Sequence, residues 1–212
     1  MTNFIPIFPL EIVVFPTEHL NLHIFEPRYK QLIKDCFEQK KPFGVPSIIN
    51  DELKEYGTLI YVKEVFKIYD NGEMDIRTEG GEIFRILEII KNIPEKLYSG
   101  AIVNYPENNG GGNTAVMAAL LAKMREMHAG LRVVKNFKKA DDDLMVYDIA
   151  HHCGLSILQE YELLQLTTEK QRLEYLRRYF ENVHQGSLEN EALRDKIKMN
   201  GHFKHLSSSF NW

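Results

Sequence analysis

The spacing of apolar residues changes at residue 107, and this change constrains the fold more than any other feature of the chain. Before "ENNGGGN", residues 107–113, apolar residues form short or alternating runs that are typical of β-strands. After it they recur every three to four positions, as on the buried face of helices. The sequence therefore predicts an α+β protein. We expect a β-rich subdomain (1–106), a glycine- and asparagine-rich linker (107–113), a helical bundle (114–185) and a tail with one short helix (186–212).

In the β-rich part, several segments have strand-like patterns. In "LNLHIF", Leu20, Leu22 and Ile24 alternate with Asn21 and His23, which predicts one apolar and one polar face. The triplet 70–72, Asp-Asn-Gly, predicts a hairpin turn after a long, bent strand over 58–69. Further strands are expected in the proline-punctuated runs "FIPIFPL" and "EIVVF" and in "EMDIRTEG", "EIFRILEIIKN" and "GAIVNY".

One helix is expected to interrupt these strands. From Pro27 onward, an apolar stripe falls at helical spacing, and its members are Tyr29, Leu32, Ile33, Cys36 and Phe37. Proline suits the first position of a helix, because no backbone donor is needed there.

The second half predicts four helices. They cover "TAVMAALLAKMREMHA", "DDDLMVYDIAHHC" and the segments near 157–165 and 169–184. Asp142 or Asp143 is expected to cap the second of these, and Gly154 to end it. Ser156 with Gln159, and Thr168 with Gln171, have the spacing of a capping box at the start of the last two.

Composition and charge argue against several classes of protein. The 212 residues carry a formal net charge of −4, which argues against nucleic acid as a partner. The N-terminus lacks a basic start, and Pro6, Pro9 and Glu11 interrupt its apolar run, so a secretory signal is not indicated. No stretch approaches the roughly 20 apolar residues of a membrane helix. Cys36 and Cys153 match no zinc or redox spacing, and they fit a reduced, cytoplasmic location.

The stretch "LNLHIFEPRYKQL", residues 20–32, holds the densest group of candidate catalytic side chains. His23 and Glu26 could form a general acid–base pair. However, His23 falls on the polar face of a strand, Glu26 directly precedes the proline that starts a helix, and the set is local in sequence. We therefore interpret it as a structural joint that sets the angle between strand and helix. In this interpretation Arg28 pairs with Glu26 or braces a neighbouring turn.

Metal binding has weaker candidates. His151, His152 and Cys153 are adjacent, and adjacent residues on a helix point about 100° apart, so they cannot all face one ion. Cys153 is expected in the core, and at least one of the two histidines at a solvated helix end. His202 and His205 have suitable spacing but lie in the tail. The sequence thus predicts neither a metal nor a cofactor.

The remaining patterns do not indicate chemistry. The triplet Asp141–Asp143 lacks calcium-loop spacing, and the basic run "RVVKNFKK" is better explained as a solvated loop than as a nucleic-acid site. The glycines of 107–113 are not followed by Lys-Ser/Thr, so they do not form a phosphate loop. No nucleophile stands in a recognisable catalytic motif.

The chain resembles the N-terminal domain of Lon proteases, also called the LON substrate-binding domain. The resemblance is carried by "IPIFPLEIVVFP" followed by "LNLHIFEPRYKQLIKDC", and then by "FGV", "GTLIYVKEV" and "GGEIFRILEI" in that order. The helical segment from "DIAHHCGLS" to "RLEYLRRYF" is also similar, so the resemblance covers roughly residues 4 to 184. The family-motif residues, with an architectural role implied, are His23, Phe25, Glu26, Pro27, Arg28 and Tyr29.

This resemblance implies a PUA-like β-pseudobarrel with one inserted helix, followed by a helical bundle. It also implies a role in holding polypeptide substrates. The sequence to Trp212 contains neither a Walker A motif nor a Ser–Lys protease domain, so we expect a stand-alone, non-catalytic module that binds unfolded or exposed polypeptide segments. The peptide-binding surface cannot be named from the sequence.

Three other functions stay open at this point. The first is an RNA-binding PUA-like domain, which the charge disfavours, and the second is an enzyme on the same fold. The third is an adaptor or subunit that pairs with itself or with a larger assembly. The tail "KMNGHFKHLSSSFNW" carries aromatic residues that either pack on this chain or dock on a partner.

Overall fold

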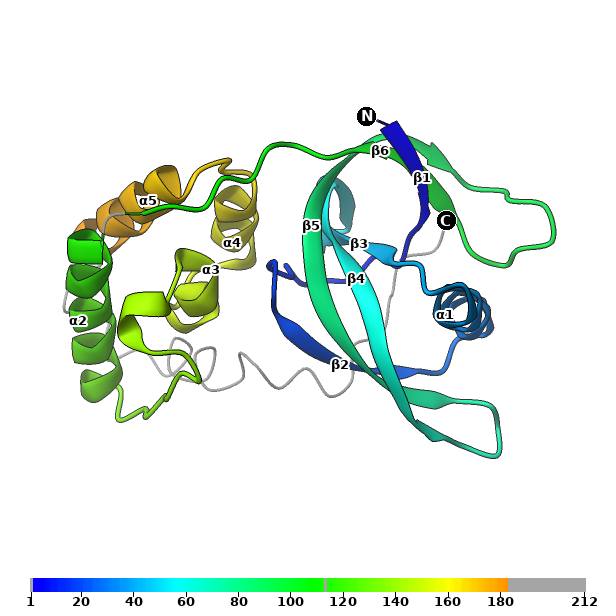
Figure 1. Ribbon diagram of the computed structural model, residues 1–212, viewed down its shortest axis with the longest axis horizontal. Coiled ribbons are helices and arrows are strands. Elements are labelled where there is room, and N and C mark those ends of the chain that lie inside the picture. The colour runs from blue at the N-terminus through cyan, green and yellow to red at the C-terminus, as the bar shows by residue number, and fades with distance from the viewer. Residues whose placement is uncertain (1, 113, 183–212) are drawn as a thin grey trace. The chain divides into compact units, whose positions relative to one another are not determined.

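The computed structural model describes residues 2–112 and 114–182, which form two compact units, 2–107 and 108–182 (Figure 1). The first unit is dominated by strands and the second by helices, so the predicted α+β class is confirmed. The expected tail helix and the histidines at 202 and 205 lie outside the described residues.

The first unit is built on an antiparallel sheet with one helix. Its described elements are β1 (Thr2–Pro6), β2 (His19–Ile24), α1 (Pro27–Gln39), β3 (Phe43–Ile49), β4 (Glu52–Ile68), β5 (Met74–Ile90) and β6 (Gly100–Asn104). The strand order is β1-β6-β5-β4-β3, and β2 pairs with the first part of β5.

The sheet curls into a nearly closed barrel. Parallel bridges join Ile7 to Gly44 and Leu10 to Ser47, so the segment after β1 meets β3 at the opposite end of the strand order. The two longest strands, β4 and β5, run side by side through the middle of the sheet (Figure 1). Their pairing shifts register at three places along β4, and such bulges bend a strand, as predicted for 58–69.

Two strands expected over 73–80 and 82–92 are one continuous strand, β5. The Gly80–Gly81 pair between them is not a turn but a point of close approach. A Cβ added to Gly80 would lie 2.4 Å from the carbonyl oxygen of Phe15, and Gly80 exchanges backbone hydrogen bonds with Thr17 and Glu18. Glycine here lets two segments of backbone touch without ending the strand.

Two other segments differ from expectation. Residues 11–15 were expected to form a strand, but they form an irregular segment whose Ile12, Val13, Val14 and Phe15 are all buried. Conversely β3 was not predicted, and its apolar run contains Pro46. The structure accommodates this proline beside a register shift between Pro46 and Ile48, where a missing donor is tolerated.

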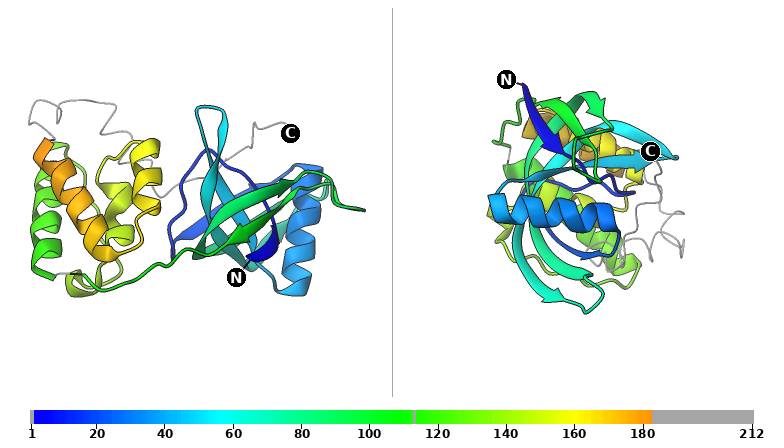
Figure 2. Two further views of the ribbon diagram at one scale, coloured as in Figure 1. Left: turned by 90° about the horizontal axis from the view of Figure 1, so that it is seen from above. Right: turned by 90° about the vertical axis from the view of Figure 1, so that its right-hand side faces the viewer.

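The helix α1 packs its apolar face onto the barrel (Figure 2). Tyr29, Leu32, Ile33 and Cys36 are buried in the cluster that also contains the apolar face of β2. Pro27 is the first helical residue, as predicted. The last member of the expected stripe, Phe37, is 45% exposed, so the buried face is shorter than the sequence pattern.

The second unit is helical. Its described elements are α2 (Thr114–Gly130), η1 (Asp141–Asp143), α3 (Val146–Ile149), η2 (Ala150–His152), α4 (Ile157–Leu164) and α5 (Glu169–Asn182). Helix α2 packs against α5 (Figure 2). The predicted capping boxes of α4 and α5 are confirmed by reciprocal hydrogen bonds between Ser156 and Gln159 and between Thr168 and Gln171.

The single helix expected over 141–153 is wrong, because the segment is broken into η1, α3 and η2. Neither Asp142 nor Asp143 caps α3. Instead Asp148, inside the first turn, accepts a hydrogen bond from the backbone N–H of Met145 at 2.9 Å. Gly154 does take the left-handed conformation expected of it, with φ of 79°.

Candidate functional site

His23 faces the hairpin between β4 and β5. Its Nδ1 lies 2.7 Å from a carboxylate oxygen of Asp75, and its Nε2 lies 3.2 Å from one of Glu73. The Tyr69 hydroxyl donates to the other oxygen of Asp75 at 2.8 Å. Partial burial raises the pKa of Asp75, but the hydrogen bonds with His23 and Tyr69 outweigh this and hold the pKa below its usual value. The hairpin turn itself is at Gly72, as predicted.

The other motif residues surround the start of α1. Arg28 pairs with Glu26 at 2.8 Å, and its guanidinium lies 4.7 Å from the centre of the Tyr29 ring. Tyr29 in turn stacks on Phe8, with ring centres 3.8 Å apart. Lys30 donates to the backbone carbonyl of Asn71 at 3.0 Å and so connects α1 to the hairpin turn. Phe25 is 38% exposed. The structure therefore brings the motif together around one strand–helix corner.

The histidine and cysteine triplet is more buried than expected. His151 is 8% exposed, and its Nδ1 lies 3.0 Å from a carboxylate oxygen of Glu160, so it is not a solvated helix-end residue. His152 is partly buried, and burial lowers its pKa to about 4. Cys153 is fully buried, as predicted. Among the described residues, no group of three or more potential ligands could hold a metal ion.

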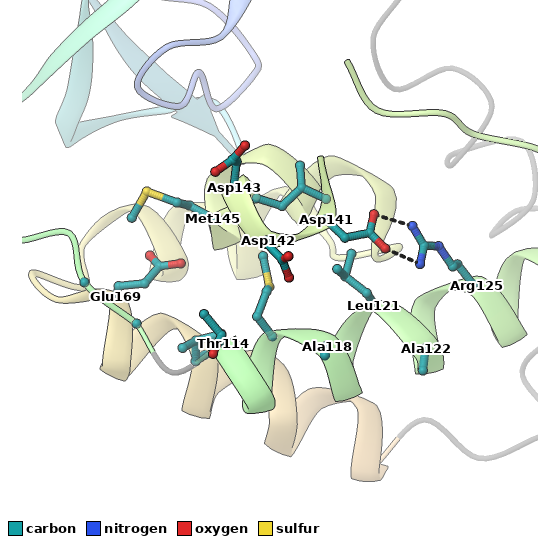
Figure 3. A pocket seen from close by; sticks show the side chains of 15 residues that line it. Thr114, Ala118, Leu121, Ala122, Arg125, Asp141, Asp142, Asp143, Met145 and Glu169 are labelled. Atoms are coloured by element: carbon teal, nitrogen blue, oxygen red, sulfur yellow. Dashed lines mark hydrogen bonds and ion pairs between the residues drawn. The ribbon is translucent and has the colours of Figure 1, made fainter. Parts of the chain in front are cut away.

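The helical unit contains an apolar groove with a volume of about 480 Å³. This falls within the range of about 300–1,000 Å³ that is common for ligand pockets. Helix α2, the segment 141–145 and the start of α5 surround it (Figure 3). Its apolar lining comprises Met117, Ala118, Leu121, Ala122, Leu144, Met145 and Leu173.

A salt bridge holds one wall of the groove to the other. Both terminal nitrogens of Arg125, on α2, lie 2.7 Å from the two carboxylate oxygens of Asp141, on η1 (Figure 3). Such a bidentate pair fixes geometry better than a single contact does. Each partner shifts the pKa of the other. The hydrogen bond with Asp141 raises the pKa of Arg125, and the hydrogen bond with Arg125 lowers the pKa of Asp141.

The other end of the groove is held by a buried ion pair. Glu169 accepts a hydrogen bond from Arg172 Nε at 2.8 Å and another from the backbone N–H of Val146 at 2.6 Å. Arg172 is 1% exposed and also donates to Asn108 Oδ1 and to the backbone carbonyl of Asn109. The glycine- and asparagine-rich stretch is therefore hydrogen-bonded to α5 at its first two asparagines.

The charges around the groove do not cancel. Arg125 neutralises Asp141, and Arg172 neutralises Glu169. Within the described part of the chain, no cation pairs with Asp142 or Asp143, and both residues are exposed. In Figure 3 the carboxylate of Asp142 points toward α2, whereas that of Asp143 points away from it. The groove thus combines an apolar floor with one inward-facing carboxylate.

A smaller pocket of about 320 Å³ lies in the first unit, beside β1 and the end of α1. Its lining includes Phe4, Asp35 and Lys41. The carboxylate of Asp35 already accepts hydrogen bonds from Lys96 and from the Tyr98 hydroxyl, both at 2.7 Å. This pocket offers less volume and a more polar lining than the groove.

The groove was not predicted from the sequence. Asp141–Asp143 were considered as calcium ligands and Asp142 or Asp143 as a helix cap, and no role was predicted for Arg172. Arg172 did leave a detectable pattern, since it shares a helical stripe with Leu173 and Leu176, both buried. A charged residue within an apolar stripe indicates a buried polar contact.

Comparison with known proteins identifies the family. Residues 5–181 match the family model described as the ATP-dependent protease La (LON) substrate-binding domain. The chain therefore belongs to this family, and the resemblance noted in the sequence is confirmed.

Solved structures show the same fold. A Lon N-terminal domain protein from Xanthomonas campestris superposes with a TM-score of 0.65 at 23% identity, covering 84% of this chain and 98% of that one. The N-terminal domain of a Mycobacterium avium complex Lon protease gives a TM-score of 0.61 at 13% identity, covering 86% of this chain and 100% of the other. In the described residues, no helix is long and apolar enough to cross a membrane.

Proposed function

We propose that the chain is a non-catalytic module that binds segments of unfolded or exposed polypeptide. Its family is one of substrate-binding domains, and in a protease the substrate is polypeptide. The observation that carries the proposal is the groove on the helical unit, whose open, apolar lining is the kind of surface that receives apolar side chains.

The chemistry of the described residues supports a binding role. Burial raises the pKa of Cys36 to about 12 and that of Cys153 still further, so neither thiol ionises to a nucleophile near neutral pH. His151, two residues before Cys153, is buried against Glu160. The described residues that line the groove include no histidine, cysteine or serine.

We also propose an architectural role for the family motif. The polar side chains of the motif make contacts within the strand–helix corner or with the hairpin: His23 pairs with Asp75 of the hairpin, and Arg28 pairs with Glu26. Tyr29 is buried by Phe8. These contacts support a joint that holds α1 and the β4–β5 hairpin together.

No observation favours the RNA-binding alternative. The net charge is −4, and the uncompensated charges at the groove are carboxylates, which repel phosphate. The buried thiols of Cys36 and Cys153 agree with a reducing, cytoplasmic location, which cell fractionation would test.

A binding assay with an unfolded protein tests the proposal. Fluorescein-labelled casein, which lacks a stable fold, should show a rise in fluorescence anisotropy when the chain is titrated into it. Unlabelled casein should compete, and a folded globular protein of similar charge should not. If the anisotropy stays flat up to about 0.1 mM of the chain, the binding free energy is weaker than about −5 kcal/mol, and the proposal of polypeptide binding is wrong.

A further inference from the structure

We propose that the groove of the helical unit selects polypeptide segments that place an apolar side chain next to a lysine or arginine. This inference rests on the proposed function and adds to it both a binding site and a sequence preference. The groove combines two features that act on different parts of a bound segment: an apolar floor and an inward-facing carboxylate.

The floor has room for an apolar side chain. Met117, Leu121 and Leu173 are buried apolar residues that line the groove. Ala118 and Ala122 lie one turn apart on α2, and both are exposed, so their small side chains leave space above the helix. Methionine adapts its shape to different partners, which suits a site that receives more than one kind of apolar side chain.

The charge favours a basic neighbour. With Asp141 and Glu169 neutralised inside the fold, Asp142 is the carboxylate that points toward α2 without a cation in the described part of the chain (Figure 3). A lysine or arginine beside the buried apolar side chain would gain this partner. A glutamate or aspartate at the same place would be repelled, and such repulsion gives specificity.

The walls of the groove are fixed in position before any segment binds. Arg125 ties α2 to η1 at one end, and Glu169 ties α5 to the backbone of Val146 at the other. Because both contacts are internal to the unit, the groove does not need a ligand to take its shape. A preformed site loses less conformational entropy on binding.

Four peptides separate the two features. They are acetylated, amidated Gly/Ser-rich 12-mers that differ only at two central positions: Leu-Lys, Leu-Glu, Ser-Lys and Ser-Glu. Leu-Lys should bind tightest. Replacing Leu by Ser should weaken binding about tenfold, because the apolar burial is lost. Replacing Lys by Glu should weaken it about fivefold, and this second effect should shrink as NaCl is raised from about 0.05 M to about 0.5 M.

Matched variants locate the site. Ala118→Leu fills the groove, whereas Ala119→Leu adds the same side chain to the same helix at an exposed position outside the lining. Ala118→Leu should weaken Leu-Lys binding about tenfold, and Ala119→Leu should leave it unchanged. Asp142→Asn should remove most of the Lys-over-Glu preference. Asp143→Asn, at the neighbouring carboxylate that points away, should remove much less.

The outcomes distinguish this inference from the proposed function. If casein binds but Ala118→Leu and Ala119→Leu behave alike, the chain binds polypeptide elsewhere, and the groove assignment is wrong. If Ala118→Leu weakens binding but Asp142→Asn leaves the Lys-over-Glu preference intact, the basic preference is wrong. If casein itself does not bind, the proposed function fails, and the inference fails with it.

Discussion

Replacing Arg172 by methionine should destabilise the helical unit by about 3–5 kcal/mol. Methionine keeps most of the length of the side chain but removes every donor. The guanidinium is 1% exposed and donates to five acceptors: Glu169 Oε2 (2.8 Å), Asn108 Oδ1 (2.7 Å), the Tyr147 hydroxyl (2.9 Å), the Leu166 carbonyl (2.8 Å) and the Asn109 carbonyl (3.1 Å).

The magnitude follows from what the substitution leaves behind. Glu169 is 3% exposed, and without Arg172 its buried charge would keep, among the described residues, only the Val146 N–H as a hydrogen-bond partner. Breaking one side of a buried ion pair costs about 3–5 kcal/mol, more than any single neutral hydrogen bond. Adding Glu169→Gln removes the stranded charge and should recover about 1–3 kcal/mol of this loss.

Two measurements check this prediction. Urea unfolding followed by circular dichroism at 222 nm reports the stability of the helices. Hydrogen exchange should speed up at the backbone amides of Asn109 and Glu169, which bond to Thr167 and Asn109 respectively. Arg178→Met is the control, because Arg178 is on the same helix but its side chain is 71% exposed and pairs only at the surface with Glu174.

The control variant should change stability by no more than about 0.5 kcal/mol. If Arg172→Met is no more destabilising than Arg178→Met, the buried network does not hold the unit together. If the double variant is less stable than Arg172→Met alone, the stranded charge is not the source of the loss.

Three further predictions concern other parts of the chain. Burial lowers the pKa of His152 to about 4 in the folded state, whereas the unfolded value is near 6.5. Between these two values the unfolded state binds more protons, so the free energy of unfolding should fall by up to about 3 kcal/mol as the pH drops from about 6.5 to about 4. Urea unfolding measured at a series of pH values should show this fall, and His152→Gln should flatten it. Gly57→Ala should destabilise the barrel by about 1–3 kcal/mol in thermal melts, since its Cβ would lie 2.4 Å from the Val45 carbonyl oxygen, while Gly130→Ala, which meets nothing within 4 Å, should not. His23→Ala should speed hydrogen exchange in the β4–β5 hairpin yet leave casein binding unchanged; a loss of binding without a change in exchange would contradict the architectural role.

Much of the fold could be predicted because its determinants are local. The alternation of Leu20, Leu22 and Ile24 indicates a half-buried strand wherever it occurs, and the stripe that begins at Tyr29 indicates a helix. Capping boxes such as Ser156 with Gln159 join residues three positions apart, so their geometry follows directly from the spacing.

The errors arose where distant backbone decided the outcome. Gly80 resembles a strand end in the sequence, but it is the point where the backbone near Phe15 touches β5. The segment 141–153 has a helical composition, yet its acidic start pairs with Arg125 on another helix. No local pattern contains these partners.

The sequence by itself determined the class of fold, the position of the change from strands to helices and the family, because apolar periodicity and motif order depend only on residues close together in the chain. Only the tertiary structure decided that an apolar groove exists, that Arg172 and Glu169 lie buried beside it, and that Asp142 rather than Asp143 faces its floor. These properties come from side chains that meet across helices α2 and α5 and the segment 141–145, and the spacing of residues within one element does not specify which residues of another element they will meet.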